Sequence, residues 1–111
     1  MTNISWEDFE KIELRIGTII RVEPFPEARK PALKLWIDFG EIGVKQSSAQ
    51  ITAYYSSANL LGTQVVAVTN FPPKKVGPFT SEVLVTGFYD TDVNVVLARP
   101  ERQVPNGSRL V

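Results

Sequence analysis

Cysteine and histidine are both absent from this sequence of 111 residues. Their absence excludes a disulfide scaffold, the usual zinc arrangements and the Ser-His and Cys-His pairs of nucleophilic catalysis. No phosphate loop occurs either, because Gly40 and Gly43 do not match G-x-G-x-x-G and no G-x-x-x-x-G-K is present. No run approaches the roughly 20 apolar residues of a membrane span, and the first residues do not resemble a signal peptide. We therefore expect a cytoplasmic protein that does not insert into membranes, requires no cofactor and is not an enzyme.

An excess of charge of either sign is also lacking, since twelve lysines and arginines balance twelve aspartates and glutamates. The charges are unevenly placed along the chain. Residues 1–14 carry one base and four acids (−3), residues 15–75 eight bases and four acids (+4), and residues 76–111 three bases and four acids (−1). Zero net charge argues against a strongly basic nucleic-acid-binding protein. A modest basic face fits the distribution, with the acidic amino-terminal segment lying elsewhere.

Two stretches of alternating apolar residues predict the first two strands. The inward-facing positions of the first are expected to be Leu14, Ile16, Thr18, Ile20 and Val22. Gly17, in the middle of this strand, suggests a bulge or a sharp coil. The inward-facing positions of the second are expected to be Leu33, Leu35, Ile37 and Phe39. Lys34 and Trp36 then share the outer face, where the indole either stacks a nucleobase, packs against a partner or is covered by a neighbouring loop.

The third predicted strand, residues 44–51, is polar. Gln46, Ser47 and Ser48 follow one another in it, and burying such a row of hydrogen-bonding side chains without partners would be costly. We therefore expect these residues to form a solvent-facing surface that can meet a ligand. A short helix with Ser56 or Ser57 as its N-cap and Gly62 as its stop is predicted to follow.

Another short helix is predicted over residues 6–11, near the amino terminus. Ser5 is placed as its N-cap, with Asp8 three residues on as a weaker form of the capping box. Trp6 and Phe9 are large apolar residues for so short an element. They either plug one end of the core or help to form a subunit interface, and the sequence favours neither interpretation over the other.

Residues 70–82, NFPPKKVGPFTSE, join a buried strand at 65–69 to another at 83–88. Three prolines and a glycine exclude a helix here and favour an extended, turning loop. The loop carries Lys74 and Lys75 in its middle and Asn70, Ser81 and Glu82 at its base. It either holds a ligand or is a solvated hairpin loop whose lysines only aid solubility.

Three strands, a helix and two further strands are the element order of the five-stranded Greek-key barrel called the OB-fold. We therefore predict an all-β fold, an OB-fold barrel with short amino-terminal and inter-strand helices, in a single domain over residues 1–111. A last strand is expected at 93–97, and an SH3-like barrel or a small sandwich stays open as an alternative. The OB-fold binds ligands on strands two and three and on two adjoining loops. The polar strand, the cations Arg29, Lys30 and Lys34, and the lysine pair all fall on those elements.

Several stretches of this sequence resemble the CsaA family. They are residues 9–19, 25–32, 44–51, 68–75, 81–84 and 104–107. That family belongs to the wider group of tRNA-binding OB domains found at the ends of methionyl-tRNA synthetases and in EMAP II-like proteins. The group's loop pattern of Asn, Pro, basic residues, Gly and Ser-Glu-Gly-Met is matched up to Glu82, after which Val83 and Leu84 replace the Gly-Met pair. The resemblance implies an OB-fold homodimer that binds tRNA and acts as a chaperone in protein export.

Two functional hypotheses follow. In the first, a homodimer binds tRNA, with Lys34, Lys74 and Lys75 on phosphates and with Glu82 positioning the lysines or accepting a base amino group. The residues that would then offer hydrogen bonds to sugars or bases are Gln46, Ser47, Ser48, Asn70 and Ser81. In the second, the protein is a chaperone with little RNA binding that holds unfolded or precursor proteins. Its apolar patches would be formed by Phe25, Trp36, Phe71 and Phe79. The export machinery is a further candidate partner, and a structural appendage of a larger complex is a third, blander option.

Overall fold

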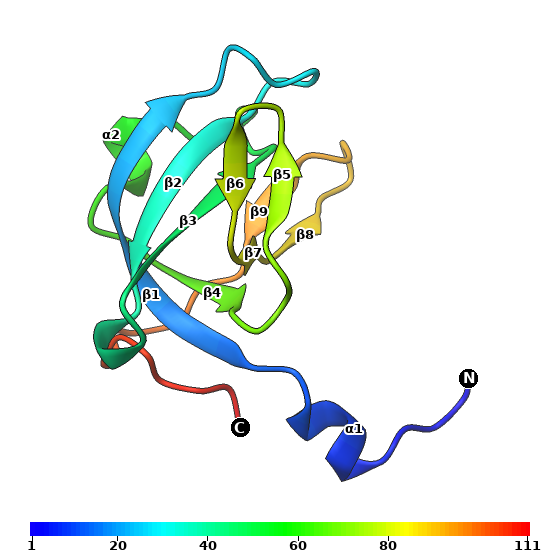
Figure 1. Ribbon diagram of the computed structural model, residues 1–111. Helices are drawn as coiled ribbons and strands as arrows, with labels where there is room; N and C mark the ends of the chain where they lie inside the picture. Colours follow the sequence, from blue (N-terminus) through cyan, green and yellow to red (C-terminus); the bar gives the residue numbers. More distant parts are fainter.

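The computed structural model covers residues 1–111 and centres on a five-stranded antiparallel sheet that curls into a nearly closed barrel (Figure 1). Its strands are β1 (Leu14–Pro24), β2 (Leu33–Asp38), β3 (Val44–Ala49), β4 (Gln64–Val68) and β7 (Leu84–Val85). Their order is β3-β2-β1-β4-β7, and the long β1 pairs with β2 through its second half and with β4 through its first. With α2 (Ser57–Leu60) between β3 and β4, this is the OB-fold that the sequence predicts.

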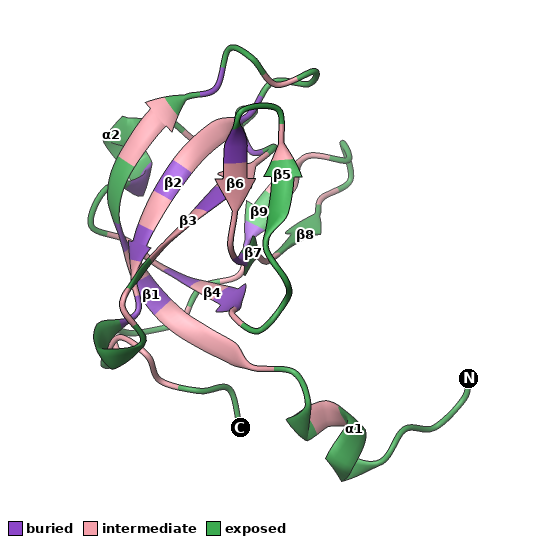
Figure 2. Ribbon diagram, in the orientation of Figure 1, coloured by how far each residue is buried: buried purple, intermediate pink, exposed green.

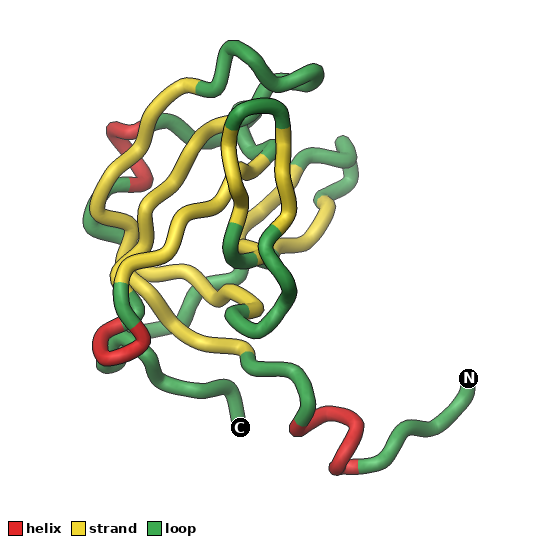
Figure 3. The backbone as a smooth tube through the Cα atoms, in the orientation of Figure 1, coloured by secondary structure: helices red, strands yellow, loops and turns green.

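Smaller elements surround the barrel. They are α1 (Trp6–Glu10), the 3-10 turn η1 (Gly40–Ile42), the hairpin of β5 (Lys74–Val76) and β6 (Phe79–Ser81), and the hairpin of β8 (Gly87–Tyr89) and β9 (Val95–Leu97). The 70–82 segment is non-helical, as predicted, but its middle forms the β5–β6 hairpin (Figure 3). The strand predicted over 83–88 is divided between β7 and β8. No helix has the length and apolar character that crossing a bilayer would require.

The barrel interior is filled by ten buried apolar residues, half of them from β1, β2 and β4 (Figure 2). They are Ile19, Leu35, Ile37, Phe39, Ile51, Leu60, Val65, Ala67, Val83 and Leu97. Three of the four positions predicted to face inward on β2 are among them, and Leu33 packs against the same cluster. The alternation of β2 is therefore confirmed.

The face predicted for β1 is wrong over much of its length. Ile19 is fully buried, whereas Ile20 is 50% exposed. A bulge between Ile19 and Arg21 shifts the register against β2, and Val22 beyond it packs on the core again. The irregularity thus lies at Ile20. Gly17 instead faces inward at a close approach, because a Cβ there would lie 2.4 Å from Ile37 Cγ2 and 2.8 Å from the Phe39 ring.

A second, smaller apolar cluster joins the β5–β6 hairpin to the outer face of β2. Phe25 and Phe79 are 3% and 7% exposed, with ring centroids 5.6 Å apart. Trp36 packs edge-on against Phe79 at 5.9 Å, and the Arg21 guanidinium lies over the Trp36 ring, 4.5 Å from its centroid. Trp36 is therefore covered by a neighbouring element, one of the three alternatives for it. The aromatic patch predicted for peptides is wrong in extent, because Phe71 alone of its four members is largely exposed.

Helix α1 lies on the amino-terminal arm, which extends away from the barrel (Figure 1). Its capping box is present: the Ser5 hydroxyl accepts from the Asp8 amide, and the Asp8 carboxylate accepts from the Ser5 amide. No residue of α1 is buried, and Trp6 is 84% exposed. The interpretation that Trp6 and Phe9 plug the core is therefore wrong.

Candidate functional site

A groove of about 1130 Å³ opens between the loop at 27–32, the β5–β6 hairpin and the end of β3. Its walls come from the loop that joins β1 to β2 and from the segment that joins β4 to β7. These are the regions with which OB-folds bind their ligands. The buried Phe25–Phe79 contact lies behind the groove and fixes one wall against the other.

Cations outnumber acids along the groove. Its charged side chains are Arg29, Lys30, Lys74 and Lys75 against Glu27 and Glu82, a local excess of two positive charges. None of the four cations takes part in an ion pair. Since no internal carboxylate neutralises them, all four can bind an anionic ligand.

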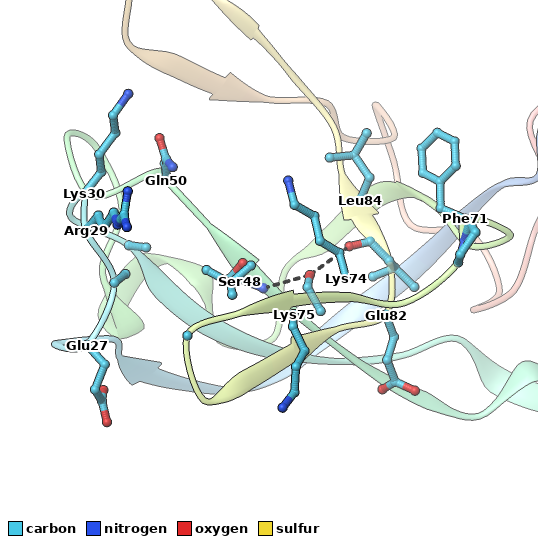
Figure 4. A pocket seen from close by; sticks show the side chains of 17 residues that line it. Glu27, Arg29, Lys30, Ser48, Gln50, Phe71, Lys74, Lys75, Glu82 and Leu84 are labelled. Atoms are coloured by element: carbon cyan, nitrogen blue, oxygen red, sulfur yellow. Dashed lines mark hydrogen bonds between the residues drawn. The ribbon is translucent and has the colours of Figure 1, made fainter.

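Lys74 and Lys75 project to opposite sides of β5, as neighbours on a strand must. Lys74 lies on the same side as Lys30, Gln50 and Leu84, whereas Lys75 points the other way (Figure 4). Both lysines line the groove, and Lys74 is the member of the predicted pair that shares a side with Lys30.

One end of the groove is apolar. Phe71, Pro72, Val83 and Leu84 line it, and Phe71 and Leu84 are 52% and 51% exposed. The Phe71 ring stands beside Leu84, on the side of the hairpin to which Lys74 points (Figure 4). Cations beside an exposed aromatic ring suit a ligand that combines phosphates with flat or apolar groups.

Gln46, Ser48, Ser81 and Glu82 are brought together as predicted, but they bond largely to one another. The Gln46 backbone amide donates to the Glu82 carboxylate at 3.1 Å, and the Ser48 amide donates to Ser81 Oγ at 3.2 Å. The Gln46 side-chain amide donates to the Thr80 carbonyl at 2.7 Å. Of these side chains, the hydroxyl of Ser48 alone lines the groove without an internal hydrogen bond.

Ser47 does not reach the groove. It is fully buried, and its hydroxyl donates to the Ser48 carbonyl at 3.0 Å. Alternation along β3 turns Ser47 inward while Gln46 and Ser48 face outward. The expectation that all three face solvent is therefore wrong for Ser47, and the burial cost is met by its hydrogen bond.

Asn70 lies outside the groove lining, and its side chain is hydrogen-bonded to main-chain groups. Its side-chain carbonyl accepts from the Glu13 amide at 3.0 Å, and its amide group donates to the Lys11 carbonyl at 2.7 Å. Asn70 thus ties the start of the 70–82 segment to the chain just ahead of β1.

Lys34 also lies outside the groove lining. Its ammonium group is 5.0 Å from the centroid of the Phe25 ring and 5.5 Å from that of Phe79, within the range of a cation–π contact. Lys34 therefore places a positive charge on the outer face of β2, against the Phe25 and Phe79 rings.

Arg29, Lys30 and Gln50 line the groove, although the sequence does not single them out as contacts. The signal for the first two is their position on the loop between the first two strands. What the sequence does not show is that this loop and β5, more than 40 positions apart, form opposite walls of one groove.

The profile of a family described as "Putative tRNA binding domain" matches residues 14–109. The chain is 32% identical to the methionine–tRNA ligase of Methanosarcina acetivorans over 110 residues and 35% identical to that of Thermococcus onnurineus over 107 residues. These matches cover 99% and 96% of this chain but only 15% and 14% of the ligases. The chain thus spans about one seventh of those enzymes.

Two solved structures of CsaA proteins match nearly the whole chain. The chaperone CsaA from Bacillus anthracis str. Ames is 52% identical with a TM-score of 0.93, covering 99% of this chain and all of that one. The CsaA chaperone protein from Picrophilus torridus is 46% identical with a TM-score of 0.91, covering 98% of this chain and all of that one. The MetRS related protein from Pyrococcus horikoshii, at 24% identity and a TM-score of 0.88, shares the fold.

The matched family is thus one of binding domains, and the likeness to both CsaA structures extends from one end of the chain to the other. The chain belongs to the tRNA-binding domain family, and within it to the CsaA proteins.

Proposed function

We propose that this protein binds tRNA in the groove that carries Arg29, Lys30 and Lys74. The observation that supports the proposal most is the gathering of unpaired cations from two separate segments beside the exposed ring of Phe71. Phosphates would bind the cations and set the position of the RNA, while an unpaired base would stack on the ring. Lys75 adds positive charge beside this site. The protein would act in the cytoplasm, where tRNA is found, as a binding protein without catalysis.

Zero net charge does not oppose this proposal, because ten of the twelve acids lie outside the groove lining. Glu7, Asp8 and Glu10 lie on α1, well away from the β5–β6 hairpin (Figure 1), and Glu13 is paired with Arg15. Exposed charges more than about 10 Å apart are largely screened at 0.1 M salt. The local excess of positive charge therefore governs the approach of RNA to the groove.

The test compares two adjacent lysines. Removing one phosphate-binding cation should reduce the slope of log K against log salt by about 0.7–0.9. Lys74→Ala should show that reduction in a tRNA titration between about 50 and 200 mM salt, and Lys75→Ala a smaller one, because Lys75 projects from β5 away from the side on which Lys30 and Lys74 lie. Lys11→Ala, on the amino-terminal arm, is the matched control. Equal reductions in all three variants, or no binding by the wild type at low salt, would contradict the proposal.

We also propose that two copies of the chain form a homodimer. The exposed apolar side chains include Ile4 and Trp6 on the arm, at 70% and 84%, and Phe88 and Val96 on the β8–β9 hairpin, at 70% and 41%. Phe88 and Val96 are register partners, so they share one face of that hairpin. Exposed apolar groups of this kind favour burial in an interface. Two copies would also present two cationic grooves to one RNA.

Light scattering at micromolar concentration tests the dimer. The wild type should give twice the chain mass, and Trp6→Ser or Phe88→Ser should shift it toward the monomer. Phe71→Ser removes an equally large exposed ring from the groove and should leave the mass unchanged. A monomeric wild type would exclude the dimer.

A chaperone function for unfolded or precursor proteins in export is the second candidate. The apolar end of the groove at Phe71 and Leu84 favours it, and so do the names of the two CsaA structures. Suppression of aggregation of a denatured client should then fall in Phe71→Ser and persist in Lys74→Ala. The reverse ranking would assign the groove to anionic ligands instead.

A further inference from the structure

The barrel has a seam at which two segments meet without forming a strand ladder. β3 lies at one end of the five-stranded sheet and β7 at the other, and residues 80–82 cross between them. A single backbone hydrogen bond spans this seam, from the Glu82 amide to the Gln46 carbonyl at 2.8 Å. The edge of β3 would otherwise present unpaired amide groups beside the groove, and such an edge invites pairing with another chain.

Side chains supply the missing acceptors at this seam. The Gln46 amide donates to the Glu82 carboxylate at 3.1 Å, and the Ser48 amide donates to Ser81 Oγ at 3.2 Å. In the opposite direction, the Gln46 side chain donates to the Thr80 carbonyl at 2.7 Å. The side chains of Ser81 and Glu82 thus occupy the places that carbonyl groups of a neighbouring strand would fill in a continuous ladder.

We infer that Ser81 and Glu82 are positioning residues, which close the barrel seam and hold the β5–β6 hairpin in place, and that they do not contact the ligand. Ser81 is the register partner of Lys74 across this hairpin. A shift of Ser81 relative to β3 therefore moves Lys74 relative to Arg29 and Lys30 on the opposite wall. The two residues act on ligand binding through the position of Lys74.

The charge of Glu82 supports this assignment. A carboxylate at the edge of a cationic groove repels phosphates, so phosphate binding does not account for an acid at this position. Its bond to the Gln46 amide does account for it, because a carboxylate is a stronger acceptor than a neutral group. Glu27 lines the same groove and makes no hydrogen bond or ion pair, so it provides a matched acid without the seam contact.

The test uses the full chain with Glu82→Gln, Glu82→Ala and Glu27→Ala. Amide hydrogen exchange at Gln46, measured by NMR on the free protein, should be about threefold to tenfold faster in Glu82→Ala, the range expected when one hydrogen bond is removed. Glu82→Gln keeps an acceptor oxygen and should leave that exchange within twofold of the wild type. Ser81→Ala should speed exchange at Ser48 in the same way. The amide of Leu35, on the central part of β2, is the internal control.

Measurements of tRNA binding distinguish three roles for Glu82: holding the hairpin in position, contacting the ligand, and repelling it by charge. Only this part of the test rests on the proposed function. Positioning predicts weaker binding by Glu82→Ala, binding by Glu82→Gln at least as tight as wild type, and tighter binding by Glu27→Ala. Equal weakening in both Glu82 variants with unchanged exchange would assign Glu82 to the ligand and overturn the inference. Unchanged Gln46 exchange in Glu82→Ala would overturn it as well. If the wild type binds no tRNA, the proposed function fails, while the exchange experiment still decides whether the seam is closed by these side chains.

Discussion

Substitution of Gly17 by alanine tests the packing of the barrel most directly. The added Cβ would lie 2.4 Å from Ile37 Cγ2 and 2.8 Å from two atoms of the Phe39 ring. Both neighbours are fully buried, so neither side chain can move into solvent to make room. Overpacking of this kind typically costs about 1–3 kcal/mol, and a β-branched neighbour is stiff at χ1. We therefore expect Gly17→Ala to lower the free energy of unfolding by roughly 2 kcal/mol.

Urea titration followed by the fluorescence of Trp36 measures this decrease. With m-values of about 1–3 kcal/mol per molar urea, the midpoint should fall by about 1 M. The double variant Gly17→Ala/Ile37→Leu checks the cause, because leucine moves the branch from Cβ to Cγ and removes the methyl group that the new Cβ meets. A coupling of about 1 kcal/mol in the double-mutant cycle is expected. A cost below about 0.5 kcal/mol for the single variant, or an additive cycle, would refute the reasoning.

Three further predictions concern other parts of the molecule. The Tyr54 hydroxyl, followed by the Asn94 amide, lowers the pKa of Asp90 below its ordinary value of 3.8. Stabilisation of the β8–β9 turn by this carboxylate should therefore be complete above pH 3.8 and disappear as the pH falls through the lower folded pKa, as NMR shifts of that turn would show. Val93, in the same turn, has a φ of 61°, which a β-branched residue adopts at a cost. Val93→Asn should therefore raise the free energy of unfolding by about 1 kcal/mol, and thermal unfolding would show this as a higher melting temperature. Phe79→Ala should cost about 3 kcal/mol in urea unfolding, because its buried ring packs against Phe25 and Trp36.

The shape of the groove is maintained by two sets of contacts within the protein, one aromatic and one of hydrogen bonds. The Phe25–Phe79 contact fixes the hairpin against the 27–32 loop, and the side chains at the seam fix it against β3. The cations therefore stand on walls that are held in place before any ligand arrives. Such preorganisation reduces the entropy that binding must overcome.

Much of this protein is determined by the sequence alone. Period-two alternation identifies β2 and its inward face, three prolines and a glycine exclude a helix from 70–82, and the Ser5–Asp8 pair identifies the start of α1. The order of strands and helix predicts the OB-fold, which the structure confirms over the alternatives of an SH3-like barrel and a small sandwich. These features depend on residues close together in the chain, and the local rules of backbone and side-chain geometry act at that range.

Only the tertiary structure decided the parts of the site that depend on contacts between distant residues. Nothing in the local pattern of the sequence shows that the bulge lies at Ile20, that Ser47 turns inward, or that Lys74 and Lys75 separate onto two faces of a hairpin. Ser81 and Glu82 resemble ligand contacts in the sequence, yet in the folded chain their oxygens accept from amides of β3. The reason is that closing a barrel brings together segments more than 30 positions apart, and which hydrogen-bonding groups are left for a ligand is decided only after those segments have bonded to each other.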